Sequence, residues 1–214
     1  MRKSQYTQYR IKVLLDKIFA LALLILLLPL FIIISILIKL DSEGPIIFKQ
    51  KRLGKNGKTF TIYKFRTMCN NAEKKGAGIF VSKNDPRITR VGRFLRKTSL
   101  DELPQLVNIL KSEMSFVGPR PPLESHPYQY KDYNDIQRLR FEILPGITGY
   151  AQAYGRNCIE WPKRIEMDVF YYKNYSLIFD LKIIISTIFN VIFSKGVYSH
   201  RHEMKNSGSV LKRG

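Results

Sequence analysis

The sequence predicts a single domain of mixed helices and strands, joined to a membrane-embedded segment near the N-terminus. The 214 residues suffice for one hydrophobic core and a small appendage. One apolar stretch, from Ile18 to Ile38, is long enough to enter a bilayer. Two strand-like runs flank Asn56-Gly57, and helix-like patterns separated by Gly/Pro-rich loops fill the remainder.

The apolar stretch is interrupted only by Pro29 and Ser35, and no small-residue cleavage site follows it, so we expect a permanent anchor. Lysines and arginines stand on both sides, and the positive-inside rule therefore places both ends in the cytoplasm. Pro29 lies near the middle, where it breaks or kinks a helix. Each half is then roughly ten residues, or about 15 Å, which is half the hydrocarbon thickness. Two alternatives follow: a helix-break-helix hairpin within one leaflet, or a mildly kinked transmembrane helix.

A β-hairpin is predicted directly after the membrane segment. Residues 45–52 and 59–65 are strand-like, and Asn56-Gly57 between them tolerates the positive φ that tight hairpin turns require. The polar, glycine-containing residues 69–85 are predicted to form a loop or a frayed helix, which ends in a turn at Pro86.

The second half of the chain alternates helices with loops. A basic helix is predicted from Val91, and residues 128–144 are predicted to form another. Residues 115–122 and 144–149 are predicted as loops, because glycine and proline release or restrict the backbone there. The first of these loops holds Arg120 on a stiff backbone.

The last apolar segment, residues 177–193, is predicted to be an amphipathic helix and not a second span. Polar side chains gather on one side of its helical wheel, and isoleucines and leucines gather on the other. Such a helix lies in a membrane interface or packs on the domain. The basic residues 195–214 are short of apolar side chains and are predicted to form a flexible tail.

The chain is strongly basic, with 36 lysines and arginines against 17 acids and a formal charge of +19. This balance predicts an anionic partner, which composition alone leaves as nucleic acid, acidic lipid or a phosphorylated substrate. The basic residues are spread along the chain instead of forming one recognition helix, so we expect no nucleic-acid partner. Cys69 and Cys158 form no CxxC pair, so we expect free thiols and no zinc site.

Two adjacent acids, Asp101 and Glu102, stand at the head of an apolar, helix-like run. One interpretation is structural: Ser99 and Glu102 match a capping box, or Asp101 is itself the N-cap with Pro104 in the first turn. The other is catalytic. A carboxylate near arginines stays ionised, as a nucleophile towards phosphorus must, and a neighbouring acid can hold a hard cation such as Mg²⁺. Spacing alone leaves both interpretations open, although Arg96, close before the pair, favours a shared site.

With these features assembled, the sequence closely resembles the small monotopic phosphoglycosyl transferases, bacterial sugar transferases that begin lipid-linked glycan assembly. The resemblance runs from Asp16 to Ser194. Five motifs in order carry it: Tyr63-Lys64-Phe65-Arg66-Thr67-Met68, Ser99-Leu100-Asp101-Glu102-Leu103-Pro104-Gln105-Leu106, Met114-Ser115-Phe116-Val117-Gly118-Pro119-Arg120-Pro121, Pro145-Gly146-Ile147-Thr148-Gly149, and Gly155-Arg156-Asn157 followed by Trp161 and Asp168.

The resemblance implies transfer of a sugar-1-phosphate from a UDP-sugar to a polyprenyl phosphate, usually undecaprenyl phosphate, with Mg²⁺ as cofactor. Asp101 would attack the β-phosphorus, release UMP and carry the phosphosugar covalently. Glu102 would complete the dyad in one of two ways. It would assist binding of the metal, which both acids would hold, or it would assist deprotonation of the acceptor. Asp168 matches a required acid of the substrate site. Three arginines match those that hold phosphate in the family: Arg96, Arg120 and Arg156.

The resemblance also implies the fold: a compact, mostly helical α/β domain, monotopic and half-sunk among the lipids of the cytoplasmic leaflet of the bacterial inner membrane. Its parts would be a re-entrant helix-break-helix in residues 1–40, a catalytic domain with a small β-hairpin and interfacial amphipathic helices in residues 41–194, and the tail. The break would fall at Pro29. Family members often carry a serine before this proline, whereas Leu28 stands here. No further membrane helices precede the break, so we expect no regulation through them.

Two other functions are compatible with the same residues. A metal-dependent phosphohydrolase acting on a UDP-sugar would use the dyad and the arginines with water as the acceptor. A non-enzymatic basic protein of the membrane surface would bind acidic lipid or nucleic acid through charge alone, and would need neither acid of the dyad.

Overall fold

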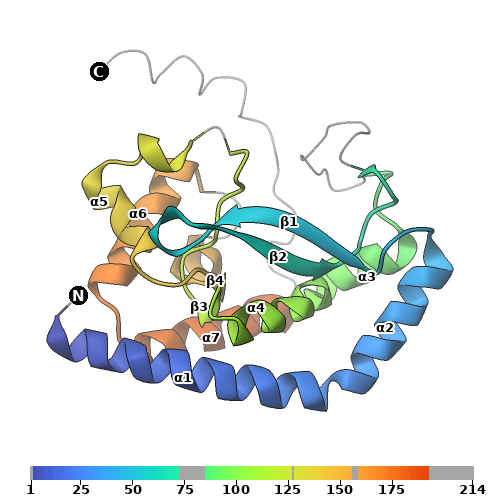
Figure 1. The fold of residues 1–214 in the computed structure, drawn as a ribbon, viewed down its shortest axis with the longest axis horizontal. Helices are drawn as coiled ribbons and strands as arrows, with labels where there is room; N and C mark the ends of the chain where they lie inside the picture. Colours follow the sequence, from blue (N-terminus) through green and yellow to red (C-terminus); the bar gives the residue numbers. More distant parts are fainter. Residues whose placement is uncertain (1, 73–84, 127, 156–158, 193–214) are drawn as a thin grey trace.

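The computed structural model describes residues 2–72, 85–126, 128–155 and 159–192. In that part of the chain helices dominate, and they surround one antiparallel and one parallel two-stranded sheet. Figure 1 shows α1 along one side of the molecule, α2 turning away from its end, and the other elements gathered on the same side of both. The mostly helical fold with a small hairpin confirms that part of the prediction. The predicted tail, together with Arg156 and Cys158, lies outside the described residues.

Helix α1 (Lys3–Leu26) and helix α2 (Leu28–Asp41) meet at a bend of 62°. Leu27 alone separates them, and Pro29 falls in the first turn of α2, where a missing N–H breaks no helical hydrogen bond. The amide of Leu27 still bonds to the preceding turn, and its carbonyl accepts from the amide of Phe31. Backbone bonding therefore continues across the bend without a serine before the proline.

No single helix in the described part of the chain is both long and apolar enough to cross a bilayer, whereas α1 and α2 pass this test as a bent pair. The sharp bend excludes a straight or mildly kinked helix. Helix α1 also extends much further towards the N-terminus than the half-length segment predicted for it. The reason is tertiary, because Tyr9, Lys12 and Asp16 on its first turns are buried against the rest of the domain.

Strands β1 (Ile47–Leu53) and β2 (Thr59–Phe65) form the predicted antiparallel hairpin, with Ile47 opposite Phe65 and Leu53 opposite Thr59. Asn56 and Gly57 both adopt positive φ, at 57° and 72°. The connection is longer than a two-residue turn and includes a short 3₁₀ segment, η1 (Lys55–Gly57). The Asn-Gly signal therefore located the hairpin correctly.

Strands β3 (Ser115–Val117) and β4 (Gly146–Thr148) pair in parallel, although both segments were predicted to be loops. This prediction was wrong because glycine here serves close approach of two backbones. A Cβ on Gly146 would lie 2.1 Å from the amide nitrogen of Gly118. The two Gly/Pro-rich segments are thus held side by side. Because the strands are parallel, the residues that follow each strand leave the sheet at the same end.

The basic helix predicted from Val91 is confirmed as α3 (Arg90–Thr98). It is followed by a 3₁₀ helix, η3 (Leu100–Gln105), and by α4 (Leu106–Leu110). The side chain of Thr89 caps α3 by accepting from the amide of Gly92 at 3.0 Å.

The single helix predicted for residues 128–144 is instead a series of short pieces. Tyr133 interrupts it, because its backbone is extended while its side chain is buried, at 1% exposure. The pieces are η4 (Tyr130–Asp132), α5 (Asp135–Arg138) and η5 (Leu139–Phe141), and after β4 come the π-helix η6 (Ala151–Gly155) and α6 (Trp161–Lys173).

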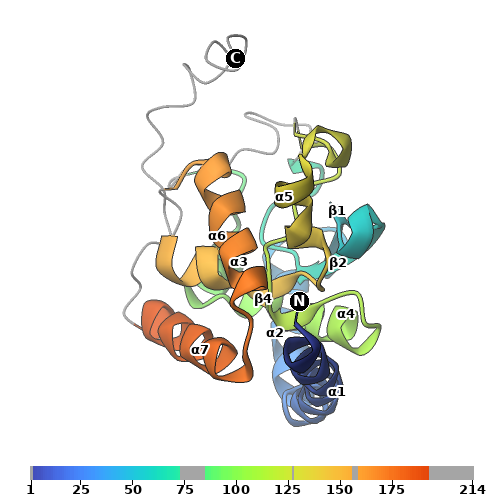
Figure 2. The ribbon, with the colours of Figure 1, turned by 90° about the vertical axis from the view of Figure 1, so that its left-hand side faces the viewer.

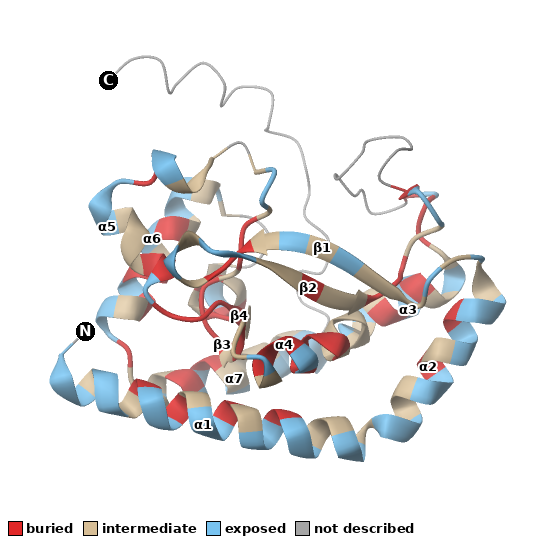
Figure 3. Cartoon of the chain, in the orientation of Figure 1, coloured by how far each residue is buried: buried red, intermediate tan, exposed pale blue. Residues whose placement is uncertain are grey.

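Helix α7 (Leu177–Ile192) is amphipathic, as predicted, and its polar side faces the protein. Asp180 pairs with Lys12 of α1, the Thr187 hydroxyl lies 2.6 Å from that of Thr148, and Asn190 donates to a carbonyl of η6. The outward side chains are apolar and exposed, and they include Ile178, Leu181, Ile185, Ile188 and Ile192. Figure 2 shows α7 beside α1, and Figure 3 shows exposed residues along the outer sides of α1 and α2.

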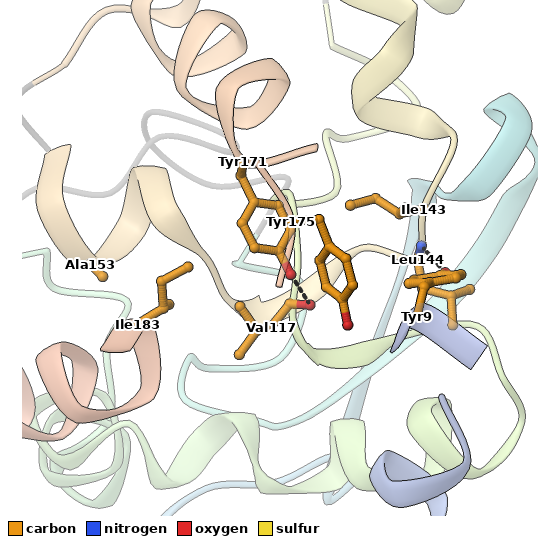
Figure 4. Close-up of a cluster of buried hydrophobic side chains, with 8 residues drawn as sticks. All are labelled: Tyr9, Val117, Ile143, Leu144, Ala153, Tyr171, Tyr175 and Ile183. Carbon is orange, nitrogen blue, oxygen red and sulfur yellow. Dashed lines mark hydrogen bonds between the residues drawn. The ribbon is translucent and has the colours of Figure 1, made fainter. Parts of the chain in front are cut away.

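One buried cluster joins α1 to the two parallel strands and to α6 and α7 (Figure 4). The Tyr9 hydroxyl accepts from the amide of Leu144 at 2.8 Å, and the Tyr171 hydroxyl lies 3.5 Å from the carbonyl of Val117. Asp16 of α1 accepts from the Ser115 hydroxyl at 2.6 Å. Helix α1 is therefore fixed to the segments that carry the Gly/Pro-rich motifs.

Candidate active site

Asp101 and Glu102 lie on η3, directly after α3 ends. Ser99 ends α3 in the left-handed region, with φ at 59°, and its side chain makes no capping hydrogen bond. Asp101 lies inside the 3₁₀ helix and is not an N-cap. Ser99 thus takes the N-cap position of η3 with both acids in the first turn, but neither predicted side-chain cap forms, and the carboxylates are left for other partners.

Apolar contacts fix η3 from two sides. Leu100 and Leu103 pack on a cluster with α2 and Phe65, while Leu106 at the start of α4 packs on Ala20 of α1. Pro104 and Gln105 are buried. The two acids thus stand on a short, rigid segment whose apolar neighbours come from both halves of the bent helix pair.

Glu102 has two cationic partners. The Lys64 ammonium lies 2.5 Å from its Oε1, and Nη2 of Arg120 lies 3.8 Å from the same atom. Burial opposes ionisation of Glu102, but Lys64, Arg120 and Arg52 outweigh it and hold the pKa of this carboxyl at about 2. Glu102 is therefore a fixed anion.

Asp101 has a different environment. Burial and, to a smaller extent, the adjacent charge of Glu102 raise the pKa of its carboxyl to about 6, although Lys64, Arg96 and Arg120 act in the opposite direction. Glu102 is thus a carboxylate with direct cationic partners. Asp101 is ionised near neutral pH but is held in a desolvated position. Such a group is well suited to attack an electrophile.

Arg96 reaches the site from α3, and its Nε donates to the Thr67 hydroxyl at 2.8 Å. Thr67 belongs to the same motif as Lys64, so this motif supplies one cation and orients another. Lys64 was not among the predicted site residues. Its position in the motif was visible, but its contact with Glu102 spans 38 residues of sequence.

Arg120 is positioned through the carbonyls around it, because prolines on both sides remove backbone donors. All four consecutive carbonyls of residues 119–122 accept a hydrogen bond. The donors are, in order, the amide of Gly146, Nη2 of Arg140, Nη1 of Arg52 and the amide of Leu53. The Arg120 side chain itself is 38% exposed and is therefore open to a ligand.

Asp168 is not brought to the dyad. It forms a fully buried ion pair with Arg140 at 2.6 Å, and the same guanidinium donates to the Arg120 carbonyl at 3.0 Å. Asp168 thus contributes to the site by orienting Arg140 under the loop that carries Arg120. Of the predicted residues, the structure brings together Asp101, Glu102, Arg96 and Arg120, whereas Arg156 lies outside the described residues.

Positive charge is in excess beside the dyad. Burial, followed by the charge of Arg120, lowers the pKa of Arg52 to about 10. Burial, Arg120 and Arg140 also lower the pKa of Arg164 on α6. Guanidinium groups that repel one another in this way leave an anion-binding potential on the Arg120 side of the dyad.

A sequence model of one family, described as bacterial sugar transferase, matches residues 7–194. The chain belongs to this family. It is 45% identical over 165 residues to the protein of Bacillus subtilis named "Uncharacterized sugar transferase EpsL", covering 77% of this chain and 79% of that one. It is 40% identical over 197 residues to "Exopolysaccharide production protein ExoY" of Sinorhizobium fredii, covering 86% of each.

A longer member of the family has a more specific name. The chain is 42% identical over 188 residues to the "UDP-glucose:undecaprenyl-phosphate glucose-1-phosphate transferase" of Escherichia coli. The match covers 86% of this chain and 40% of that protein. The region matched by the family model, residues 7–194, contains Asp101, Glu102, Arg96, Arg120 and the bend between α1 and α2.

Proposed function

We propose that this chain transfers a sugar-1-phosphate from a UDP-sugar to undecaprenyl phosphate, giving the polyprenyl-diphosphate sugar and UMP. The observation that carries the proposal is the Asp101 carboxylate, desolvated beside Glu102 and surrounded by Lys64, Arg96 and Arg120. The names of several relatives, which specify sugar-phosphate transfer to undecaprenyl phosphate, support the choice of donor and acceptor.

The reaction proceeds in two displacements at one phosphorus atom. An Asp101 carboxylate oxygen forms a bond to the β-phosphorus of the UDP-sugar, and the bond from this phosphorus to the bridging oxygen breaks, so that UMP leaves with the electron pair. A phosphate oxygen of the acceptor then attacks the same phosphorus, and the Asp101 carboxylate leaves unchanged. Splitting the transfer in this way replaces one difficult encounter of two anions by two easier steps.

The cations lower the barrier by neutralising the phosphoryl oxygens. Charge on transferring phosphoryl groups is stabilised by arginine and lysine positioned before the reaction begins. Arg96 and Arg120 stand on different elements, α3 and the loop after β3, so the two can contact different oxygens of a diphosphate. Glu102 keeps Lys64 next to Asp101.

Mg²⁺ is the cofactor that we propose. The two acids fit it, because Mg²⁺ is commonly held by one or two carboxylates together with substrate phosphates and water. The described ranges contain no cluster of three or more histidine, cysteine or acidic side chains, and within them the Asp101 carboxylate makes no hydrogen bond. Asp101 and Glu102 would hold the ion, which when bound supplies further neutralisation of the phosphate oxygens.

The acceptor is a membrane lipid. The bent helix pair supports a re-entrant topology, in which α1 and α2 enter and leave the cytoplasmic leaflet on the same side. The outward side chains of α1, α2 and α7 include many exposed apolar groups, which are costly in water and favourable in a bilayer. Basic residues flank the pair at both ends. On this proposal the chain is monotopic and contacts the lipids of the bacterial inner membrane.

The transfer is tested with a UDP-sugar radiolabelled in the β-phosphate and with undecaprenyl phosphate in bilayer discs. The expected products are UMP and a labelled lipid, and Asp101→Asn abolishes both these products and covalent labelling of the protein. Asp135→Asn, which changes a fully exposed acid, serves as the control and remains active. Free sugar phosphate without labelled lipid would instead indicate a phosphohydrolase, and an active Asp101→Asn would refute the nucleophile.

The re-entrant topology is tested with single cysteines at Ser4 and Lys58, both exposed, in a variant without Cys69 and Cys158. In intact cells both sites should resist a membrane-impermeant thiol reagent and react only after lysis. Reaction of one site alone in intact cells would mean that the helix pair crosses the membrane.

A further inference from the structure

Five consecutive residues, 64–68, connect the candidate active site to the end of helix α2. Lys64 binds Glu102, and Thr67 accepts from Arg96. Between these two contacts, Arg66 binds α2, so one short segment reaches both places. The catalytic scheme proposed above gives Arg66 no role.

Arg66 caps the C-terminal end of α2. Its Nη2 donates to the carbonyl of Ser42 at 2.6 Å, to the Ser42 hydroxyl at 3.1 Å and to the carbonyl of Ile38 at 3.4 Å. The last carbonyls of a helix have no helical partners and carry partial negative charge, so a cation there is favourable. Arg66 is buried at 6% exposure, and its Nε and Nη1 have no hydrogen-bond partner within the described part of the chain. All guanidinium hydrogen bonds of Arg66 therefore go to the end of α2.

The surroundings of α2 are shaped for this contact. Gly44 has a φ of +119°, and a Cβ on it would lie 2.3 Å from Nη1 of Arg66. The neighbouring ring of Phe65 packs with Ile34 and Ile38 of α2. The end of α2 is thus attached to this segment by a charged cap and by an apolar contact.

A second connection runs from α2 to α3. Asp41, the last residue of α2, accepts from the amide of Val91 at 2.9 Å. Val91 lies in the first turn of the helix that carries Arg96. A displacement of the end of α2 would therefore reach the dyad through Lys64 and would reach Arg96 both through Thr67 and through α3.

We propose that Arg66 is a positioning residue, whose cap on α2 holds Lys64 and Thr67 where they contact the dyad and Arg96. This inference rests on the proposed transfer reaction for its readout. It implies that the position of α2 in the lipid determines where the Lys64 and Arg96 side chains lie relative to the dyad. A misplacement of about 1 Å can cost roughly 100-fold in rate.

The test separates the rate constant of the first displacement from the fraction of competent enzyme. Rapid-quench measurement of UMP release from the full chain in bilayer discs, without acceptor, yields a burst amplitude and a burst rate constant. For Arg66→Met we expect a rate constant at least tenfold lower with an amplitude close to that of the wild type. Arg66→Lys keeps a donor for the carbonyls of α2, so its burst rate constant should lie between those of Arg66→Met and the wild type. Arg93→Met removes an exposed arginine of α3 as a matched control and should leave both values unchanged.

A loss of amplitude with an unchanged rate constant would overturn the inference, because Arg66 would then only support folding. A rate constant within twofold of the wild type at full amplitude would overturn it as well. If Arg66→Met does not fold, Arg66→Lys decides between the same outcomes. A wild type without any burst would count against the covalent scheme and not against Arg66, and kcat per folded molecule would then be compared across the same variants.

Discussion

The two acids of the dyad are predicted to affect stability in opposite directions, although they are neighbours in sequence. The folded protein raises the pKa of the Asp101 carboxyl from 3.8 to about 6 and lowers that of Glu102 from 4.5 to about 2. A pKa change of this size corresponds to about 3 kcal/mol at 25 °C. The ionised form of Asp101 therefore destabilises the fold, fully so above pH 6, and this cost declines as the pH falls from 6 to 3.8. The ionised form of Glu102 stabilises the fold above pH 4.5, and this contribution is lost as the pH falls through 2.

At pH 7.5 in EDTA, Asp101→Asn should therefore stabilise the protein while abolishing activity, and Glu102→Gln should destabilise it by leaving the partly buried Lys64 ammonium without its partner. One kcal/mol shifts the melting temperature of a domain of this size by about 2–4 °C, so changes of roughly 6–12 °C are expected in each direction. The measurement is thermal unfolding by intrinsic fluorescence in one detergent or bilayer disc. Exposed acids provide the controls, Asp135→Asn and Glu166→Gln, which should shift the midpoint by less than about 2 °C.

A midpoint for Asp101→Asn at or below that of the wild type would refute this reasoning, because burial would then not be working against the Asp101 charge. Repeating the comparison with Mg²⁺ adds a second check. A cation held by the two acids stabilises their ionised forms, so the advantage of Asp101→Asn over the wild type should shrink as Mg²⁺ is added.

Three further results are expected. Lys12→Met leaves the buried charge of Asp180 without its partner at 2.6 Å and should lower the free energy of unfolding by about 3–5 kcal/mol, with denaturant unfolding as the measurement; a loss below 1 kcal/mol would contradict a buried pair. Gly92→Ala places a Cβ 2.1 Å from the carbonyl oxygen of Thr67, so α3 must shift. We expect the free energy of unfolding to fall by about 1–3 kcal/mol and kcat/KM to fall several-fold. Full activity would show that α3 does not position the site. The kcat/KM for UDP-sugar should decline below pH 6 as Asp101 gains a proton, and added Mg²⁺ should move this decline to lower pH; a decline that Mg²⁺ does not move would argue against metal binding by this carboxylate.

Local signals in the sequence predicted the parts of the fold that depend on local physics. Asn56-Gly57 located the hairpin because only a few residue types accept positive φ at adjacent positions. Pro29 located the bend because it lacks a backbone donor. The hydrophobic pattern of α7 predicted two chemically different sides, and the structure adds that the polar side is the inner one.

What failed depended on contacts between distant segments. The capping box was a sound local pattern, but Glu102 pairs with Lys64 on another element, and Ser99 is needed to end α3. The segments around Gly118 and Gly146 were read as loops, because glycine marks close backbone approach as well as turns, and sequence spacing does not say which strand lies opposite.

The same limit applies to the candidate site. Asp101, Glu102, Arg96 and Arg120 were identified from motifs that stand close to the chemistry. Arg140 was missed because its role requires a buried acid from α6 and a carbonyl of the proline loop, and no short motif encodes that combination.

The orientation of α7 has a practical consequence for protein engineering. Its hydrogen bonds to the domain come from one side of the helix, while the isoleucines and leucines on the other side make no polar contact within the described chain. Lysine and glutamate could therefore replace Ile178, Leu181, Ile185 and Ile188 without removing a bond that holds the helix in place. Such a redesign gives α7 a water-compatible exterior, and it offers a starting point for preparing the protein with less detergent.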